Sequence, residues 1–231
     1  MISIVLMEIE HPGNVGAIAR SMGNFGFVDL VLVNPKCDHL CQEARCRAKH
    51  AQGILEDARV VDASVLDTFD YLIGTTARVG NDYNIKRSPI TPNELASVLK
   101  GKKASFGLLI GREGNGLTND EVKRCDYTVT IPASKEYATL NISHAVAILL
   151  YALHGVVADS NHTDHFIVAG VDEKKHLFEA FDELLDNLPF ETPEKKETQR
   201  MVWKKLVGKS MLTKREAFAL FGLFKKMREK R

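Results

Sequence analysis

Residues 131–155 read IPASKEYATLNISHAVAILLYALHG, and the rest of the chain is organised around this stretch. From about Asn141 onward it has almost no polar face, which predicts a helix that is buried rather than laid on a surface. The apolar run is too short to span a bilayer. A polar turn precedes the helix, and helix capping is the simplest role for its side chains. These side chains are Ser134, Glu136, Thr139, Asn141 and Ser143.

Outward from this helix, short β-branched runs alternate with helical patterns. The expected strands are 2–7, 28–33, 59–61, 70–77, 105–110 and 128–131. This alternation predicts an α/β domain over residues 1–157, with a mostly parallel sheet flanked by helices. A polar, aperiodic linker is expected at 158–171, followed by a small helical extension at 172–231. In that extension we expect Asp172 to cap the first helix and Thr213 with Glu216 to form a capping box.

Charge is strongly segregated along the 231 residues, although the net charge is only +1. Residues 195–231 hold thirteen Lys and Arg against three Glu, which is a net +10, so the remainder carries −9. A basic block of this kind favours an anionic partner such as nucleic acid. A solvated helix face is the alternative interpretation.

Apolar content of 45% and charged content of 26% are those of an ordinary globular protein. We expect a cytoplasmic protein with no membrane partner, because neither a signal-peptide pattern nor a membrane-length apolar run is present. Cys37, Cys41 and Cys46 with His50 superficially resemble metal-ligand spacing. They lack the paired short-spaced knuckles of a zinc site, so we expect no metal and free thiols.

The segment 11–27, HPGNVGAIARSMGNFGF, follows the first expected strand. Its apolar residues recur at helical spacing, and Asn14 is expected to cap the helix. Gly16, Arg20 and Asn24 then share another face at four-residue steps. A glycine one turn before an arginine leaves space above the guanidinium, as a ligand would need. A surface arginine on a helix that happens to contain glycine is the equal alternative.

A glycine-rich loop, GREGNGL at 111–117, follows the expected strand 105–110 and leads into a helix. Strand, glycine-rich loop and helix together are a common cradle for anions and nucleotides. The spacing is neither the dinucleotide fingerprint nor a Walker loop, so neither of those sites is expected. Small residues also end the strand at 74–77, where open α/β sheets bind ligands. The polar stretch 78–92, with Arg78, Lys86 and Arg87, is expected to form a loop that touches substrate.

Three segments together resemble the SpoU branch of the SPOUT RNA methyltransferases. They are HPGNVGAIAR at 11–20, LIGREGNGL at 109–117, and the segment from Ile131-Pro132 to TLNIS at 139–143. The tail, residues 198–216, resembles the C-terminal extension of TrmJ-type tRNA ribose methyltransferases. The resemblance implies a trefoil-knotted domain, a homodimer with the substrate site across its interface, and S-adenosylmethionine bound in the knot loops. The implied cofactor contacts are Thr75, Thr76, Ala77, Gly111, Ile131, Thr139, Leu140 and Asn141.

The resemblance also implies that Arg20 is the catalytic arginine, supported by Asn14, Glu113 and Asn141. An arginine stays protonated in proteins, so we assign Arg20 to orienting the RNA phosphate and the 2′-hydroxyl, with direct proton removal left open. The expected activity is 2′-O-ribose methylation of tRNA at nucleotide 32 of the anticodon loop. The alternatives are a ribosomal RNA or another tRNA position as substrate, or an inactive knotted RNA-binding protein.

Overall fold

A computed structural model describes residues 1–77, 89–134, 136–158 and 167–229 of the chain. It divides into two compact units, Met1–Gly101 with Ser105–His162, and Lys102–Ala104 with Thr163–Arg231. Part of the expected linker, residues 159–166, lies outside the described residues, as do Arg78, Lys86 and Arg87 of the expected substrate loop.

The first unit is built on a six-stranded sheet of order β3-β2-β1-β5-β4-β6, in which every neighbouring pair is parallel. The central strand β1 is buried at all six positions, as its unbroken apolar sequence predicts. The predicted parallel α/β architecture is therefore confirmed, while the threading of a trefoil knot stays a prediction. The strands are β1 (Ile2–Met7), β2 (Leu30–Val33), β3 (Arg59–Val61), β4 (Tyr71–Thr75), β5 (Phe106–Ile110) and β6 (Tyr127–Val129).

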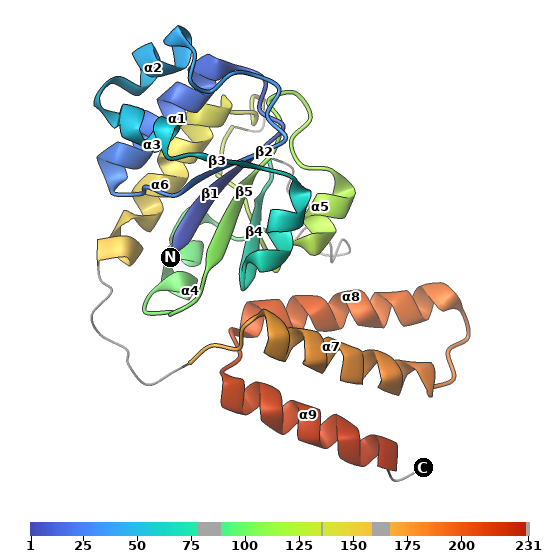
Figure 1. Cartoon of the computed structure of the whole chain (residues 1–231). Helices are drawn as coiled ribbons and strands as arrows, with labels where there is room; N and C mark the ends of the chain where they lie inside the picture. The colour runs from blue at the N-terminus through green and yellow to red at the C-terminus, as the bar shows by residue number, and fades with distance from the viewer. Residues whose placement is uncertain (78–88, 135, 159–166, 230–231) are drawn as a thin grey trace. The chain divides into compact units, whose positions relative to one another are not determined.

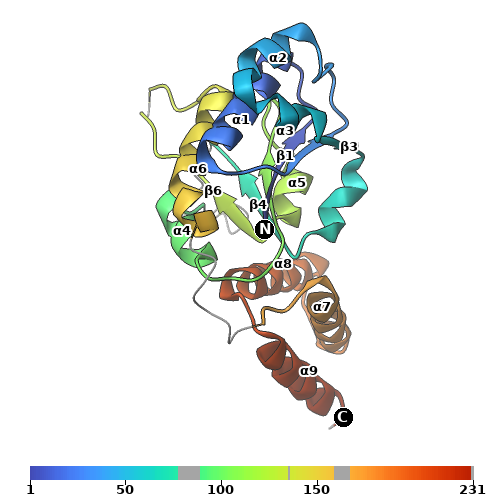
Figure 2. The ribbon, with the colours of Figure 1, turned by 60° about the vertical axis from the view of Figure 1, so that its left-hand side comes forward.

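Helices cover both faces of this sheet (Figure 1). On one face α6 (Ile142–Ala158) packs against α1 (Pro12–Phe25) and α4 (Pro92–Leu99), and Figure 2 shows α6 between them. The opposite face is covered by α5 (Asn119–Arg124) and the 3-10 helix η2 (Ala63–Thr68). Successive side chains of β1 point to opposite faces of the sheet. Val5 and Met7 point to the face covered by η2 and α5 and belong to the apolar cluster there.

Three short helical segments lie against α1 and complete its surroundings. They are α2 (Gln42–Ala48), the 3-10 helix η1 (Lys49–Ala51) and α3 (Gln52–Glu56). Helix α1 ends at Gly26, whose φ of 78° lies in the left-handed region that favours glycine.

The expectation that the apolar helix α6 is buried all round was wrong in part. Val146, Leu149 and Leu153 are buried, but Ile148 is 39% exposed and Tyr151 is 73% exposed. The sheet and its neighbouring helices cover one side of α6, and an apolar stripe stays open in a single copy of the chain. No helix in the described ranges is long and apolar enough to cross a membrane.

The second unit contains α7 (Val171–Asp186), α8 (Pro193–Ser210) and α9 (Lys214–Glu229). Its core is aromatic, with the Phe181 and Trp203 rings stacked at a centroid distance of 4.6 Å and Phe224 packed against both. The Thr213 and Glu216 capping box is confirmed. Asp172 does not cap α7: the helix begins at Val171, Gly170 is its N-cap, and Asp172 lies in the first turn.

Candidate active site

Glu113, in the glycine-rich loop after β5, reaches the N-terminus of α1. Its carboxylate accepts hydrogen bonds from the backbone N–H groups of Glu10 and His11, each at 3.2 Å, and from Asn14 Nδ2 at 3.3 Å. A carboxylate beside the start of a helix is also favoured by the helix dipole. These contacts join the first and second sequence motifs.

Asn14 connects this carboxylate to the third motif. Because its Nδ2 donates to Glu113, its Oδ1 faces the other way and accepts from Asn141 Nδ2 at 3.4 Å. Asn141 Oδ1 in turn accepts from the backbone N–H of Ser143 at 2.9 Å and from its hydroxyl at 2.7 Å. Glu113, Asn14, Asn141 and Ser143 therefore form one hydrogen-bonded chain, which we call the motif network.

Both asparagines were expected to cap a helix, and the structure confirms this for Asn141 but not for Asn14. Asn141 does satisfy a first-turn donor of α6, through the Ser143 backbone. Asn14 does not cap α1: the helix begins at Pro12 after His11, and Asn14 lies within its first turn. Its side chain is thus free of a capping role and holds the network instead.

Arg112 fixes the loop that carries Glu113. Its guanidinium donates to Glu8 Oε1 at 2.8 Å and to Glu121 Oε2 at 3.0 Å. The loop closes on itself through reciprocal backbone hydrogen bonds between Arg112 and Gly116. The hydrogen bond and charge of Arg112 lower the pKa of Glu8. Burial would raise the pKa of Glu121, but the hydrogen bonds from Arg112 and Thr118 and the charge of Arg112 lower it overall. Sequence reasoning missed this clamp.

The need for glycine at position 111 comes from the protein's own loop. A Cβ built on Gly111 would lie 2.2 Å from the carbonyl carbon of Gly116 and 2.3 Å from the nitrogen of Leu117. Gly16 is similar, since a Cβ there would lie 2.1 Å from the Ala44 oxygen of α2. The interpretation of Gly16 as clearing space for a ligand was wrong, because α2 occupies that space.

The residues expected to contact a cofactor come from the carboxyl ends of three neighbouring parallel strands, β5, β4 and β6. Thr75 ends β4, Gly111 follows β5, and Ile131 follows β6 by two residues. Thr75 Oγ1 donates to Leu109 O at 3.1 Å, and Thr76 N–H donates to Val129 O at 3.0 Å, which ties the three strand ends together. Ala77 lies two residues beyond the end of β4.

Residues 131–134 and 136–141 leave β6 without regular structure and lead into α6. Within the described part of the chain, the backbone N–H groups of Ile131, Thr139 and Leu140 donate to no acceptor. Unused backbone donors at the carboxyl edge of a parallel sheet, beside a tight glycine turn, suit an adenosine-containing ligand such as S-adenosylmethionine. The donor set therefore fits the cofactor that the sequence resemblance implies.

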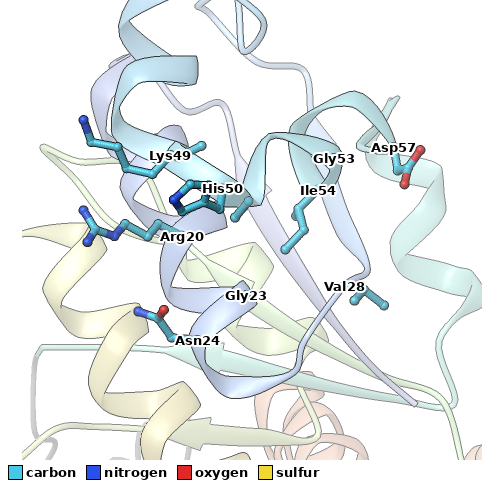
Figure 3. A pocket seen from close by; sticks show the side chains of 11 residues that line it. Arg20, Gly23, Asn24, Val28, Lys49, His50, Gly53, Ile54 and Asp57 are labelled. Atoms are coloured by element: carbon cyan, nitrogen blue, oxygen red, sulfur yellow. The ribbon is translucent and has the colours of Figure 1, made fainter.

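Arg20 lies apart from the motif network in the described structure. It is six residues beyond Asn14 on α1, which is about 9 Å along the helix axis. Its exposed side chain makes no hydrogen bond or ion pair with the described residues. It borders a cavity of about 660 Å³ between α1 and the segment formed by η1 and α3 (Figure 3). The structure thus brings together Asn14, Glu113 and Asn141, but not Arg20.

Comparison with known proteins decides the family. The model of the family described as SpoU rRNA Methylase matches residues 1–151, which include the whole motif network.

The chain belongs to the SpoU rRNA methylase family.

Like the family, it is a methyltransferase. It is 37% identical over 228 residues to the tRNA (cytidine-2′-O-)-methyltransferase TrmJ of Methanocaldococcus jannaschii, covering 97% of this chain and 99% of that protein.

Solved structures of similar proteins agree with the fold. TrmJ from Z. mobilis ZM4 aligns over 99% of both chains with a TM-score of 0.72 and 25% identity. A probable methylase family protein from Haemophilus influenzae aligns over 99% of this chain and 96% of its own, with a TM-score of 0.66 and 30% identity. Both alignments extend through the C-terminal helices. In the described residues no group of three or more His, Cys, Asp and Glu side chains is arranged to hold a metal ion.

Proposed function

We propose that this methyltransferase transfers the methyl group of S-adenosylmethionine to a ribose 2′-hydroxyl of tRNA, at nucleotide 32 of the anticodon loop. The observation that carries the proposal is the 37% identity to a tRNA (cytidine-2′-O-)-methyltransferase over nearly the whole of both chains. The similarity includes the basic helical unit as well as the sheet domain. The family description names rRNA, which keeps ribosomal RNA as the second candidate substrate.

In this proposal the cofactor lies at the carboxyl edge of β5, β4 and β6. Its contacts are Thr75, Thr76, Ala77, Gly111, Ile131, Thr139, Leu140 and Asn141. When bound, S-adenosylmethionine supplies an activated methyl group on a sulfonium sulfur. The chain itself must align the hydroxyl with that methyl group and keep water out.

The motif network gives those contacts a fixed geometry. Glu113 holds Asn14, Asn14 holds Asn141, and Asn141 begins α6 directly after Thr139 and Leu140. A displacement in the glycine-rich loop is therefore passed to the start of α6, on the other side of the cofactor. Asn14, Glu113 and Asn141 act in this account by positioning.

Arg20 orients the substrate. Its guanidinium is a planar fork of donors that suits a phosphate, and it stays charged, so we assign it to binding the RNA backbone and the nucleophilic hydroxyl, with direct removal of the hydroxyl proton left open. Its lack of any partner among the described residues leaves all its donors available for RNA.

The proposed enzyme is a homodimer in the cytoplasm. The exposed stripe of α6, with Ile148 and Tyr151, lies beside Phe25 of α1, whose ring meets that of Tyr151 edge-on at 6.0 Å. Covering this apolar stripe with a second copy would bury it, and would allow Arg20 of one copy to serve the cofactor loops of the other. Sedimentation should show a dimer that Tyr151→Glu converts to monomers; a monomeric wild type would refute this part.

The basic helical unit is proposed to hold the tRNA backbone. Within this unit, residues 195–231 carry a net charge of +10, which the acidic residues of α7 balance in part. The remaining positive charge would give sequence-independent, salt-sensitive affinity.

The direct test is incubation of the protein with labelled S-adenosylmethionine and either bulk tRNA or ribosomal RNA lacking 2′-O-methylation, followed by mapping of the modified nucleotide. Label at tRNA nucleotide 32 is expected. Label in ribosomal RNA alone would show that ribosomal RNA, and not tRNA, is the substrate. Label in neither RNA would favour an inactive RNA-binding protein.

A further inference from the structure

The cavity beside Arg20 has a basic end whose side chains are unused. Arg20 and Asn24 project from α1, and Lys49 and His50 from η1 opposite (Figure 3). All four residues are exposed, and none of their side chains has a hydrogen-bond or ion-pair partner in the described part of the chain. Two cations and two further polar groups therefore border one end of this hollow, and none of them has an acceptor from the described part of the protein.

The remainder of the cavity is apolar and open. Val28 and Ile54 lie on its other side, and Val28 is 71% exposed. Asp57 is the acidic residue of the lining, and Figure 3 shows it on the far side from the Arg20 guanidinium and the Lys49 ammonium. An anion is thus favoured at one end and a flat apolar group at the other. A volume of about 660 Å³ is within the range of small-ligand sites.

Lys49 has a backbone conformation that L residues rarely adopt. Its φ is 54° and its ψ is −117°, in a region that favours glycine. Strained backbone of this kind is concentrated at functional sites. This backbone conformation makes Lys49 a candidate for a functional side chain.

We propose that this cavity is a nucleotide subsite for the RNA substrate, next to the nucleotide that is methylated. Arg20, Lys49 and His50 bind the phosphate of that neighbouring nucleotide, and its base lies against Val28 and Ile54. Arg20 connects the two positions, because it also orients the reacting ribose. The subsite rests on the proposed function, in that the RNA strand entering it is the strand being methylated.

The test compares full-length Lys49→Ala, Lys49→Gly and Lys49→Arg with the wild type. Lys123→Ala is the matched control, because Lys123 is an exposed lysine on α5, which covers the opposite face of the sheet. The dissociation constant for unmethylated bulk tRNA is measured at several salt concentrations. Steady-state kcat and KM for tRNA, and the dissociation constant for S-adenosylmethionine, complete the comparison.

Lys49→Ala should weaken tRNA binding and raise KM by roughly five- to tenfold, the loss of one charge-assisted contact, with kcat within about twofold. The slope of log affinity against log salt should fall by about 1. Lys49→Gly should lose the same affinity while its melting temperature stays or rises, since its backbone is relaxed. Lys49→Arg should retain binding, and S-adenosylmethionine affinity should not change in any variant.

Unchanged tRNA affinity and salt slope in Lys49→Ala would overturn the subsite, as would Lys49→Gly with normal affinity. An equal loss in Lys123→Ala would overturn it too, by making the effect one of general charge. Binding of cytidine 5′-monophosphate tests whether the cavity takes a free nucleotide instead. If Lys49 contributes to its binding and it binds more tightly than tRNA does, the RNA subsite is refuted. Failure of the wild type to methylate tRNA refutes the proposed function separately, because the binding comparison does not depend on turnover.

Discussion

Asn141 Nδ2 donates a hydrogen bond to Asn14 Oδ1 at 3.4 Å, although 127 positions separate the two residues in the chain. The same Asn14 amide donates to Glu113, so one side chain links the start of α1, the loop after β5 and the start of α6. All three segments emerge at the carboxyl edge of the parallel sheet. This single asparagine therefore couples the two sides of the proposed cofactor site.

Glu113→Gln tests that coupling. The glutamine keeps the size of the side chain but removes the charge that the Glu10 and His11 N–H groups share. In either orientation of its amide, its NH₂ group faces a donor that the carboxylate accepts from: Glu10 N–H, or His11 N–H and Asn14 Nδ2. We expect a loss of about 1 kcal/mol in stability and a roughly 10- to 100-fold slower methyl transfer from the displaced loops.

The check is urea unfolding together with single-turnover transfer. Glu10→Gln is the control, because Glu10 is exposed and its carboxylate has no partner in the described residues. Equal rates in Glu113→Gln and Glu10→Gln would show that the network does not position the site.

Arg112→Met tests the clamp on the glycine-rich loop. The Arg112 and Glu121 side chains are only 18% and 13% exposed, whereas Glu8 is 33% exposed. Removing the arginine leaves two partly buried carboxylates, so we expect a loss of about 2 kcal/mol, less than for a fully buried pair. Urea midpoints at pH 7 measure this loss.

The same variant should change the pH dependence of stability. Arg112 holds the pKa of Glu8 below the usual 4.5 and, together with Thr118, holds that of Glu121 below it. The stability that these ion pairs contribute is therefore fully present above about pH 4.5, the pKa in the unfolded chain. It is lost as the pH falls through the lower pKa values of the folded state. The difference in unfolding free energy between wild type and Arg112→Met should shrink between about pH 5 and pH 3. A constant difference would contradict the ion pairs.

Gly16→Ala tests the contact between α1 and α2. The added Cβ meets the Ala44 carbonyl oxygen, and we expect a loss of about 1–3 kcal/mol as α2 is pushed away. Gly53→Ala is the matched helical control: a Cβ there meets nothing within 4 Å, so a gain of about 0.5–1 kcal/mol is expected. Similar melting temperatures for the two variants would argue against the close approach.

Much of the fold could be predicted from the sequence because the strands are short, continuous apolar runs that a sheet buried on both faces requires. The stripe of α6 could not, since hydropathy identifies Ile148 and Tyr151 as apolar without saying which surface covers them. The space around Gly16 is set by Ala44, on a helix packed from elsewhere in the chain.

The candidate site shows the same limit. Asn14, Glu113 and Asn141 were assembled by resemblance, and the structure supplies their order in the network. The Arg112 clamp could not be seen in the sequence, because Glu8 lies 104 positions away. Nor does any local pattern show the backbone of Lys49 at a φ of 54°.

Arg20→Ala and Arg20→Lys should both slow single-turnover methyl transfer by roughly 100-fold or more, because lysine keeps the charge but lacks the planar fork. Thermal stability and S-adenosylmethionine affinity should stay near the wild type, since Arg20 contacts no described residue by hydrogen bond or ion pair. Full rescue by lysine would reduce the role of Arg20 to charge alone, and near-normal transfer by Arg20→Ala would remove it from the mechanism.

The central claim is tested most directly by methyl transfer to two tRNA transcripts that differ only at nucleotide 32, one with ribose there and one with 2′-deoxyribose. The hydroxyl at that position is the proposed nucleophile, so labelled S-adenosylmethionine should methylate the first transcript and leave the second unlabelled. Equal labelling of the two transcripts would contradict 2′-O-methylation at nucleotide 32.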